Sequence, residues 1–77
     1  MTLNNVLKLG TYVLAFIDSL DHEKAKMFIK EFEETIFFLE KTYGCLENQM
    51  SANDYKFVSV VYEAISKYER SGCSHFN

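Results

Sequence analysis

Few side chains in this sequence could bind a metal ion or act as a nucleophile. The soft and borderline ligands are Cys45, Cys73, His22 and His75. A zinc site needs three or four such ligands at fixed spacing, and these residues fall in separate segments of the chain. A cysteine nucleophile needs a histidine close in space and an oxyanion hole, yet Cys73-x-His75 lies in a segment without a regular pattern. We therefore expect no metal site, no cofactor and no catalytic residue.

Two further patterns involve groups that can exchange protons. Arg70 and His75 resemble, in spacing alone, the Arg/His motif of the small all-helical ribonucleases of the HEPN superfamily. Those domains are longer than this chain, and here the pair spans the expected end of a helix. Glu31, Glu33 and Glu34 are interspersed with lysines, which is typical of a solvated helix face rather than of a cleft. The sequence thus favours a protein that is not an enzyme.

Charge and composition exclude several classes of partner. The net charge is −3 and Arg70 is the one arginine, whereas nucleic-acid backbones are bound by clustered Lys and Arg. The apolar stretch 9–17 is shorter than the roughly 20 residues that span a bilayer, and two acids follow it. Two cysteines are too few for a disulfide framework. We expect a cytoplasmic protein that binds neither nucleic acid nor membrane.

Length and composition indicate one small helical domain. A chain of 77 residues has room for a single domain, which we place at residues 1–70, with a frayed tail at 71–77. The sequence has no proline and three isolated glycines. Long uninterrupted helices are favoured, and phosphate-binding glycine loops are absent. A solitary core of this size is marginally stable, so association with a partner would help.

The first predicted helix covers about residues 3–20. Its apolar side chains project onto an arc about 180° wide, which is broader than the stripe of about 100° on an ordinary surface helix. The members of this arc are Leu3, Val6, Leu7, Leu9, Val13, Leu14, Phe16, Ile17 and Leu20. Gly10 falls inside the arc, where it costs about 1 kcal/mol relative to Ala. We expect close approach of another helix at Gly10.

The second predicted helix covers about residues 22–43 and forms an antiparallel hairpin with the first. Capping side chains precede it at residues 18–22, and Gly44 follows it, where a left-handed residue commonly ends a helix. Its apolar stripe comprises Ala25, Phe28, Ile29, Phe32, Ile36, Leu39 and Tyr43. The hairpin leaves the third segment to complete the core.

The third predicted helix covers about residues 52–70. Ser51-x-x-Asp54 is a variant of the capping box at its start. Its apolar face comprises Phe57, Val58, Val60, Val61, Ala64, Ile65 and Tyr68. The β-branched run 57–61 would also suit a strand, but the helical spacing continues to Tyr68. The predicted fold is an all-α, three-helix bundle that forms a dimer.

Some apolar side chains fall outside the predicted core. Met27 and Phe38 project together, opposite the stripe of the second helix, and Phe37 projects among lysines. Either these residues contact another chain, or the third helix covers Phe38. The wide arc of the first helix also exceeds what one small bundle readily covers. The candidate interface residues are Leu9, Gly10, Phe16, Met27, Phe37 and Phe38.

These features predict a binding function. The leading hypothesis is a small protein-interaction module, acting as a regulator, inhibitor or chaperone-like adaptor, that docks apolar helix faces to itself or to another protein. The alternative is an acidic immunity protein, antitoxin or phage-encoded inhibitor that neutralises a basic target by charge complementarity. A nucleic-acid-binding hairpin dimer is disfavoured because no segment of the chain is basic.

Overall fold

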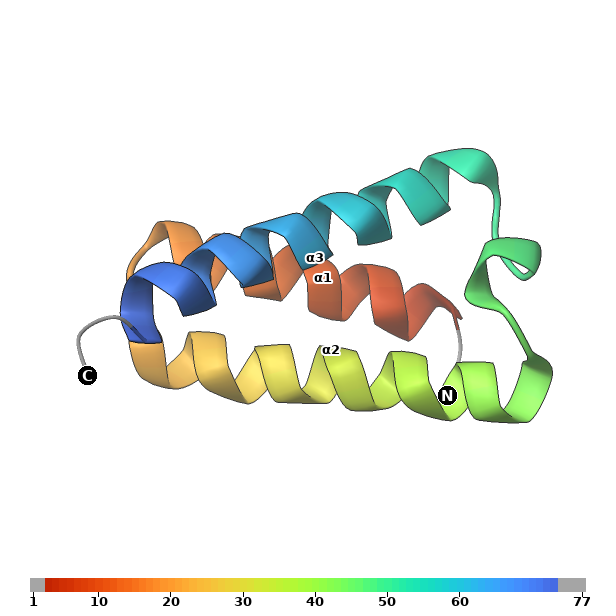
Figure 1. The fold of residues 1–77 in the computed structure, drawn as a ribbon, viewed down its shortest axis with the longest axis horizontal. Coiled ribbons are helices and arrows are strands. Elements are labelled where there is room, and N and C mark those ends of the chain that lie inside the picture. Colours follow the sequence, from red (N-terminus) through yellow and green to blue (C-terminus); the bar gives the residue numbers. More distant parts are fainter. Residues whose placement is uncertain (1–2, 74–77) are drawn as a thin grey trace.

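The computed structural model describes the backbone of residues 3–73 and the side chains of residues 3–70. This part of the chain forms three α-helices and one short 3-10 helix, and it contains no β-strand. The elements are α1 (Leu3–Asp18), α2 (His22–Tyr43), η1 (Leu46–Asn48) and α3 (Ala52–Cys73) (Figure 1). The predicted all-α bundle of a hairpin and a third helix is confirmed, and the strand alternative at 57–61 is wrong.

Two helix ends differ from the predicted ones. α1 ends at Asp18 instead of near residue 20, because the next residues form a tight turn. α3 ends at Cys73, beyond the predicted end at Arg70. The prediction ended the helix where the apolar pattern stops. The helical backbone hydrogen bonds can continue through residues that have no apolar side chain. The rest of the predicted tail, including His75, lies outside the described residues.

The turn between α1 and α2 is a Schellman motif with leucine in the position that glycine usually takes. The Leu20 N–H donates to the Ile17 carbonyl at 3.2 Å, and the Asp21 N–H donates to the Phe16 carbonyl at 3.0 Å. Leu20 has φ = 60°, a left-handed conformation that is unfavourable for a residue with a Cβ. Its side chain is 70% exposed. The prediction that Leu20 belongs to the apolar arc is therefore wrong.

Side-chain and glycine caps define both ends of α2. The Asp21 carboxylate accepts a hydrogen bond from the Lys24 N–H at 3.2 Å, which satisfies one of the free amides at the helix start. At the other end, Gly44 has φ = 98°, and its N–H donates to the Glu40 carbonyl at 2.9 Å. A Cβ at Gly44 would meet no atom within 4 Å. The backbone conformation, rather than lack of space, favours glycine here, as predicted.

The connector from α2 to α3 is anchored to the core. Leu46 of η1 is buried, and its N–H donates to the Glu40 carboxylate at 3.4 Å. The Gln49 side-chain amide donates to the Gly44 carbonyl. At the start of α3, the Ser51 hydroxyl accepts from the Asp54 N–H at 3.2 Å, which confirms the serine half of the predicted cap. The connector therefore closes one end of the bundle.

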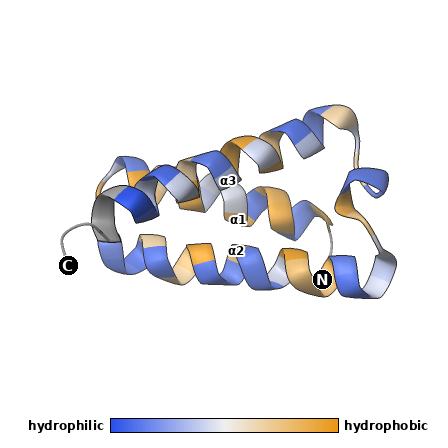
Figure 2. Ribbon diagram, viewed as in Figure 1, coloured by the Kyte–Doolittle hydropathy of each residue, from blue (hydrophilic) through white to orange (hydrophobic). Residues whose placement is uncertain are grey.

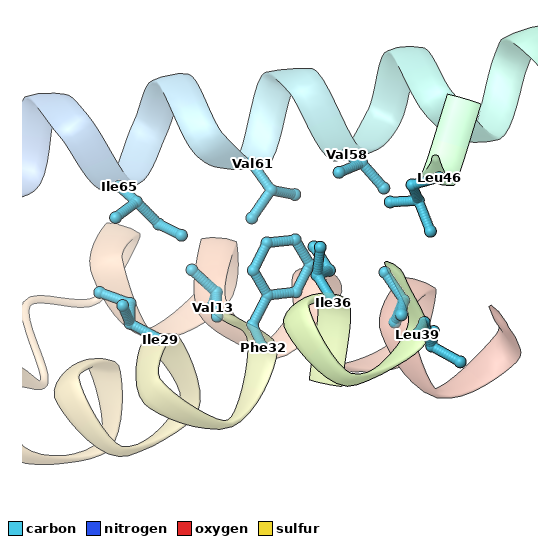
Figure 3. Close-up of a cluster of buried hydrophobic side chains, with 10 residues drawn as sticks. Val13, Ile29, Phe32, Ile36, Leu39, Leu46, Val58, Val61 and Ile65 are labelled. Carbon is cyan, nitrogen blue, oxygen red and sulfur yellow. The ribbon is translucent and has the colours of Figure 1, made fainter. Parts of the chain in front are cut away.

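The core lies where α2 and α3 meet α1, which packs against both of them. Hydrophobic and hydrophilic segments alternate along the helices, as amphipathic packing requires (Figure 2). Figure 3 shows side chains of α2 and α3 pointing toward one another, with Leu46 at the connector end. The buried cluster comprises Val6, Val13, Ile29, Phe32, Ile36, Leu39, Leu46, Val58, Val61 and Ile65.

The predicted apolar stripes include two further residues that the bundle does not cover. Tyr43, in the last turn of α2, is exposed, and so is Val60 of α3. Both were predicted to face the core, and both predictions are wrong. The reason is geometric: each helix contacts its neighbours along a limited arc, and an apolar residue at the edge of a broad stripe stays in water.

Gly10 of α1 lies at the tightest point of the bundle. A Cβ built on Gly10 would be 2.9 Å from Cε2 of Phe57, 3.1 Å from Cγ2 of Val61 and 3.2 Å from Cε1 of Phe32. Phe57 and Val61 belong to α3, and Phe32 belongs to α2. The predicted close approach of another helix is confirmed, and both neighbouring helices contribute to it. We call these four residues the Gly10 seam.

Candidate interaction surface

The six predicted interface residues lie in different parts of the bundle. On α2, Phe37 is 67% exposed, Met27 is 52% exposed and Phe38 is 47% exposed. On α1, Leu9 is half-buried and packs against the core, while Gly10 is buried in the Gly10 seam. The sixth residue, Phe16, is half-buried. The third helix does not cover Phe38, so about half of its side chain remains in water.

An aromatic cluster of Tyr12, Phe16 and Phe28 joins α1 to α2 at the surface. The ring centroids of Tyr12 and Phe28 are 5.2 Å apart, and those of Phe16 and Phe28 are 5.3 Å apart in a stacked arrangement. The Tyr12 and Phe16 rings are also stacked, at 6.3 Å. These distances are typical of favourable aromatic pairs. Tyr12 is exposed and the two phenylalanines are half-buried, so the cluster presents its rings to solvent.

Two opposite charges flank the cluster along α2. Lys24 places its ammonium 5.5 Å from the centroid of the Phe16 ring, within cation–π range. Phe28 follows Lys24 by one helical turn, and Glu31 follows Phe28 by about one more turn. The three side chains therefore lie along one stripe of α2, which we call the Lys24–Glu31 stripe. Its order is positive charge, aromatic ring, negative charge.

Phe37 lies on a different side of α2 from the aromatic cluster. It is nine residues beyond Phe28, which places it about 180° around the helix. The Lys41 ammonium is 5.9 Å from the centroid of its ring, and Lys30 shares the same side of the helix. Phe37 is thus an isolated exposed ring beside lysines, whereas the cluster is a contiguous aromatic surface.

An acidic surface borders α2 and α3. Tyr62 of α3 packs its ring edge-on against Phe32, with centroids 5.5 Å apart, and it remains exposed on its outer side. Partial desolvation raises the pKa of Tyr62, and the carboxylates of Glu33 and Glu40 raise it further. Desolvation also raises the pKa of Glu33, with a second contribution from Glu69. Glu33 and Glu69 therefore repel one another, and this side of the bundle is negatively charged.

His22 takes part in a contact between helices. Its Nδ1 lies 2.8 Å from the Tyr68 hydroxyl, and the two ring centroids are 5.7 Å apart. This contact ties the start of α2 to the later turns of α3. Both residues are at least partly in solvent. The arrangement holds two helices together.

The side chains of residues 3–70 that could bind a metal ion are dispersed. Within residues 3–70, no three side chains of His, Cys, Asp or Glu are grouped so that they could hold a metal ion. Cys45 carries an exposed free thiol in the connector. The Cys73 side chain and His75 lie outside the described part of the chain. In the described segment, no helix is both long and apolar enough to cross a lipid bilayer.

Sequence reasoning missed Tyr12 and Phe28 as surface partners. Tyr12 falls on the polar arc of the first helix. Phe28 was assigned to the core stripe of the second helix, and it does pack against the core, but its partly exposed ring was not predicted. A signal was nevertheless present, because Tyr12 and Phe28 are equally distant in sequence from Leu20. In an antiparallel hairpin with its turn at Leu20, such residues lie at the same level. The same rule pairs Phe16 with Lys24.

We compared the chain with models of known protein families, with curated proteins and with solved structures, and none of them matches it.

Proposed function

We propose that this chain is a small protein-interaction module that acts by docking apolar helix faces to itself or to another protein. It would serve as a regulator, an inhibitor or a chaperone-like adaptor, and it would act by binding rather than by catalysis. The proposed location is the cytoplasm. The exposed free thiol of Cys45 supports that location, because such thiols persist in reducing compartments.

One observation carries this proposal. The buried core is assembled without Tyr12, Met27, Phe37 and Phe38, which stay exposed on α1 and α2. Aromatic residues and methionine are enriched where proteins contact one another, and methionine adapts to differently shaped partners. Burying these side chains against a second chain would also stabilise a domain too small for a large core of its own.

The test compares variants in the capture of partners from the source cells. We expect Phe37→Ser or Phe38→Ser to lower the amount of co-purifying partner about tenfold, which corresponds to 1.4 kcal/mol of binding free energy. The matched control is Val60→Ser, which makes the same kind of change at an exposed residue of α3. Circular dichroism should show unchanged helicity in all three variants.

Two outcomes would contradict the proposal. Equal capture by the wild type, the two phenylalanine variants and the control would show that the exposed rings of α2 make no contact. Loss of the whole fold in Phe37→Ser or Phe38→Ser would place that ring in the core instead of at an interface. Sedimentation equilibrium of the same proteins would report whether the partner is a second copy.

The acidic surface favours a second candidate function, the neutralisation of a basic target by an immunity protein, antitoxin or phage-encoded inhibitor. Glu33 and Glu40 place negative charge near the exposed ring of Tyr62, and Glu69 adds negative charge near Glu33. For this function we expect complex formation to weaken steeply with added salt, and Glu33→Gln with Glu40→Gln to reproduce that weakening at low salt. Apolar docking would be nearly independent of salt.

A further inference from the structure

We propose that the aromatic cluster is the contact surface of an antiparallel homodimer, in which Lys24 of each copy faces Glu31 of the other. The inference rests on the interaction function proposed above and deepens it by naming the surface, the partner and the register. It adds Tyr12, Phe28 and the Lys24–Glu31 stripe to the residues that sequence reasoning singled out.

The outer face of α1, beside the aromatic cluster, carries few charges. The aromatic cluster presents its rings to solvent, and Met27, next to Phe28 in the chain, is also exposed. The exposed residues of α1 are Asn4, Asn5, Lys8, Thr11, Tyr12, Ala15 and Asp18. Two of these residues carry a charge, which matches the depletion of charged residues at the centre of protein interfaces.

The charge order of the Lys24–Glu31 stripe suits a second copy. A two-fold axis that passes beside α2, level with the midpoint between Met27 and Phe28, reverses the order of residues in the second copy. Lys24 of one copy then lies opposite Glu31 of the other, and the reverse pair forms on the other side of the axis. Two ion pairs flank the facing aromatic clusters. The stripe is therefore complementary to itself in the antiparallel orientation.

Neither charged side chain of the stripe is engaged in an ion pair with a described residue, and the Lys24 ammonium lies over the Phe16 ring at the edge of the cluster. Within residues 3–70, the ion pair present joins Glu63 to Lys67 at 3.6 Å, and neither Lys24 nor Glu31 takes part in one. The two residues are seven positions apart, or about 10 Å along the helix axis, which is too far for a direct contact within one copy. In the proposed dimer, each of them lies opposite its counterpart in the other copy.

The other exposed apolar surfaces suit a second copy less well. A two-fold axis midway between Met27 and Phe38 would bring Glu31 against Glu34 of the other copy, a repulsive arrangement. A two-fold contact at the acidic surface would bring the carboxylates around Tyr62 together. Like charges facing one another disfavour association. Of these surfaces, the aromatic cluster is the one whose charges attract those of a second copy.

The test is a charge exchange followed by sedimentation equilibrium on the full chain. The wild type should dimerise, and Lys24→Glu and Glu31→Lys should each weaken the dimer by about tenfold or more, because every pair becomes repulsive. Mixing the two variants should restore association, because the reversed residue in each chain then meets an opposite charge in the other. The variant that carries both changes should dimerise as the wild type does.

Controls separate the proposed register from general effects of charge. Lys30→Glu makes the same charge reversal on the far side of α2, and Val60→Ser removes an exposed apolar side chain of α3; neither should change the dimer. A wild type that is monomeric at about 100 μM would overturn the inference, as would mixing that fails to restore association. Neither result affects the capture experiment with Phe37 and Phe38, so the broader interaction function is tested separately.

Discussion

The Gly10 seam and the aromatic cluster are built from the same kinds of residue, yet one is interior and the other is surface. Phe32 of the seam and Phe28 of the cluster are one helical turn apart on α2. Phe32 is fully buried because α1 and α3 both cover it. Phe28 packs against the edge of the core, its ring contacts are with α1, and it stays partly exposed. The number of neighbouring helices, rather than side-chain type, decides whether an aromatic residue holds the fold together or remains available for a partner.

The sharpest test of this comparison replaces each phenylalanine with alanine. Phe32→Ala should lower the free energy of unfolding by about 3–5 kcal/mol, because it leaves a cavity where three helices meet. That loss approaches the whole stability of many small domains. Phe28→Ala should cost clearly less, since its ring is already partly in water. Urea denaturation followed by circular dichroism measures both, and equal losses would remove the distinction between the two regions.

A smaller effect is expected at Gly10 itself. Gly10→Ala gains about 1 kcal/mol of helix propensity but forces a methyl group against Phe57 and Val61, and such overpacking costs about 1–3 kcal/mol. We expect a net loss of about 1 kcal/mol in the free energy of unfolding. Adding Val61→Ala removes one of the clashing atoms, so the two changes together should cost less than the sum of their separate effects. Strict additivity would mean that the seam is looser than the distances indicate.

A substitution in the turn between α1 and α2, which aligns the two halves of the aromatic cluster, should instead raise the free energy of unfolding. Leu20→Gly relieves a left-handed backbone at a residue whose side chain is largely in water. We expect the free energy of unfolding to rise by about 1 kcal/mol. Leu20→Ala keeps a Cβ and serves as the control, with little or no gain. Destabilisation by glycine would indicate that the leucine side chain contributes to the hairpin.

The smallest expected effect is a pH dependence of the free energy of unfolding. It arises at the acidic surface, outside both the Gly10 seam and the aromatic cluster. Desolvation first, and Glu69 second, raise the pKa of Glu33 above its ordinary value of 4.5. The folded state then binds this proton more tightly than the unfolded state does. Stability should therefore fall as the pH rises from about 4.5 through the raised pKa. Glu33→Gln should flatten that slope slightly in denaturation curves recorded across this range, and an unchanged slope would exclude Glu33 as its source.

The local features of the fold could be predicted because each depends on a few neighbouring residues. The helical periodicity places α1, α2 and α3, Gly44 marks the end of α2, and Ser51 caps the start of α3. The close approach at Gly10 was predictable because a glycine in the middle of an apolar arc needs a reason to be there. These signals carry no information on which residues of different helices meet.

Predicting the candidate surface would have required knowing which residues of different helices meet. Whether Phe28 faces the core or the surface depends on how α2 is rotated against α1, and a broad apolar stripe is compatible with several rotations. Leu20 illustrates the same limit, because leucine seldom adopts a left-handed conformation and its apolar character predicted a place in the helix. Exposed Met27, Phe37 and Phe38 were correctly placed outside the stripe of α2. That they lie on different sides of α2 gains meaning only once the position of the aromatic cluster is known.

The Leu20 turn makes the aromatic cluster the more local of the two regions along the chain. The ring contacts of the aromatic cluster on α2 reach back only to Phe16 and Tyr12 across that turn. The Gly10 seam has to wait for Phe57 and Val61, far later in the chain. Contacts close in sequence close small loops and form early, while distant ones form late. We therefore expect the aromatic cluster to form before the Gly10 seam as the chain folds.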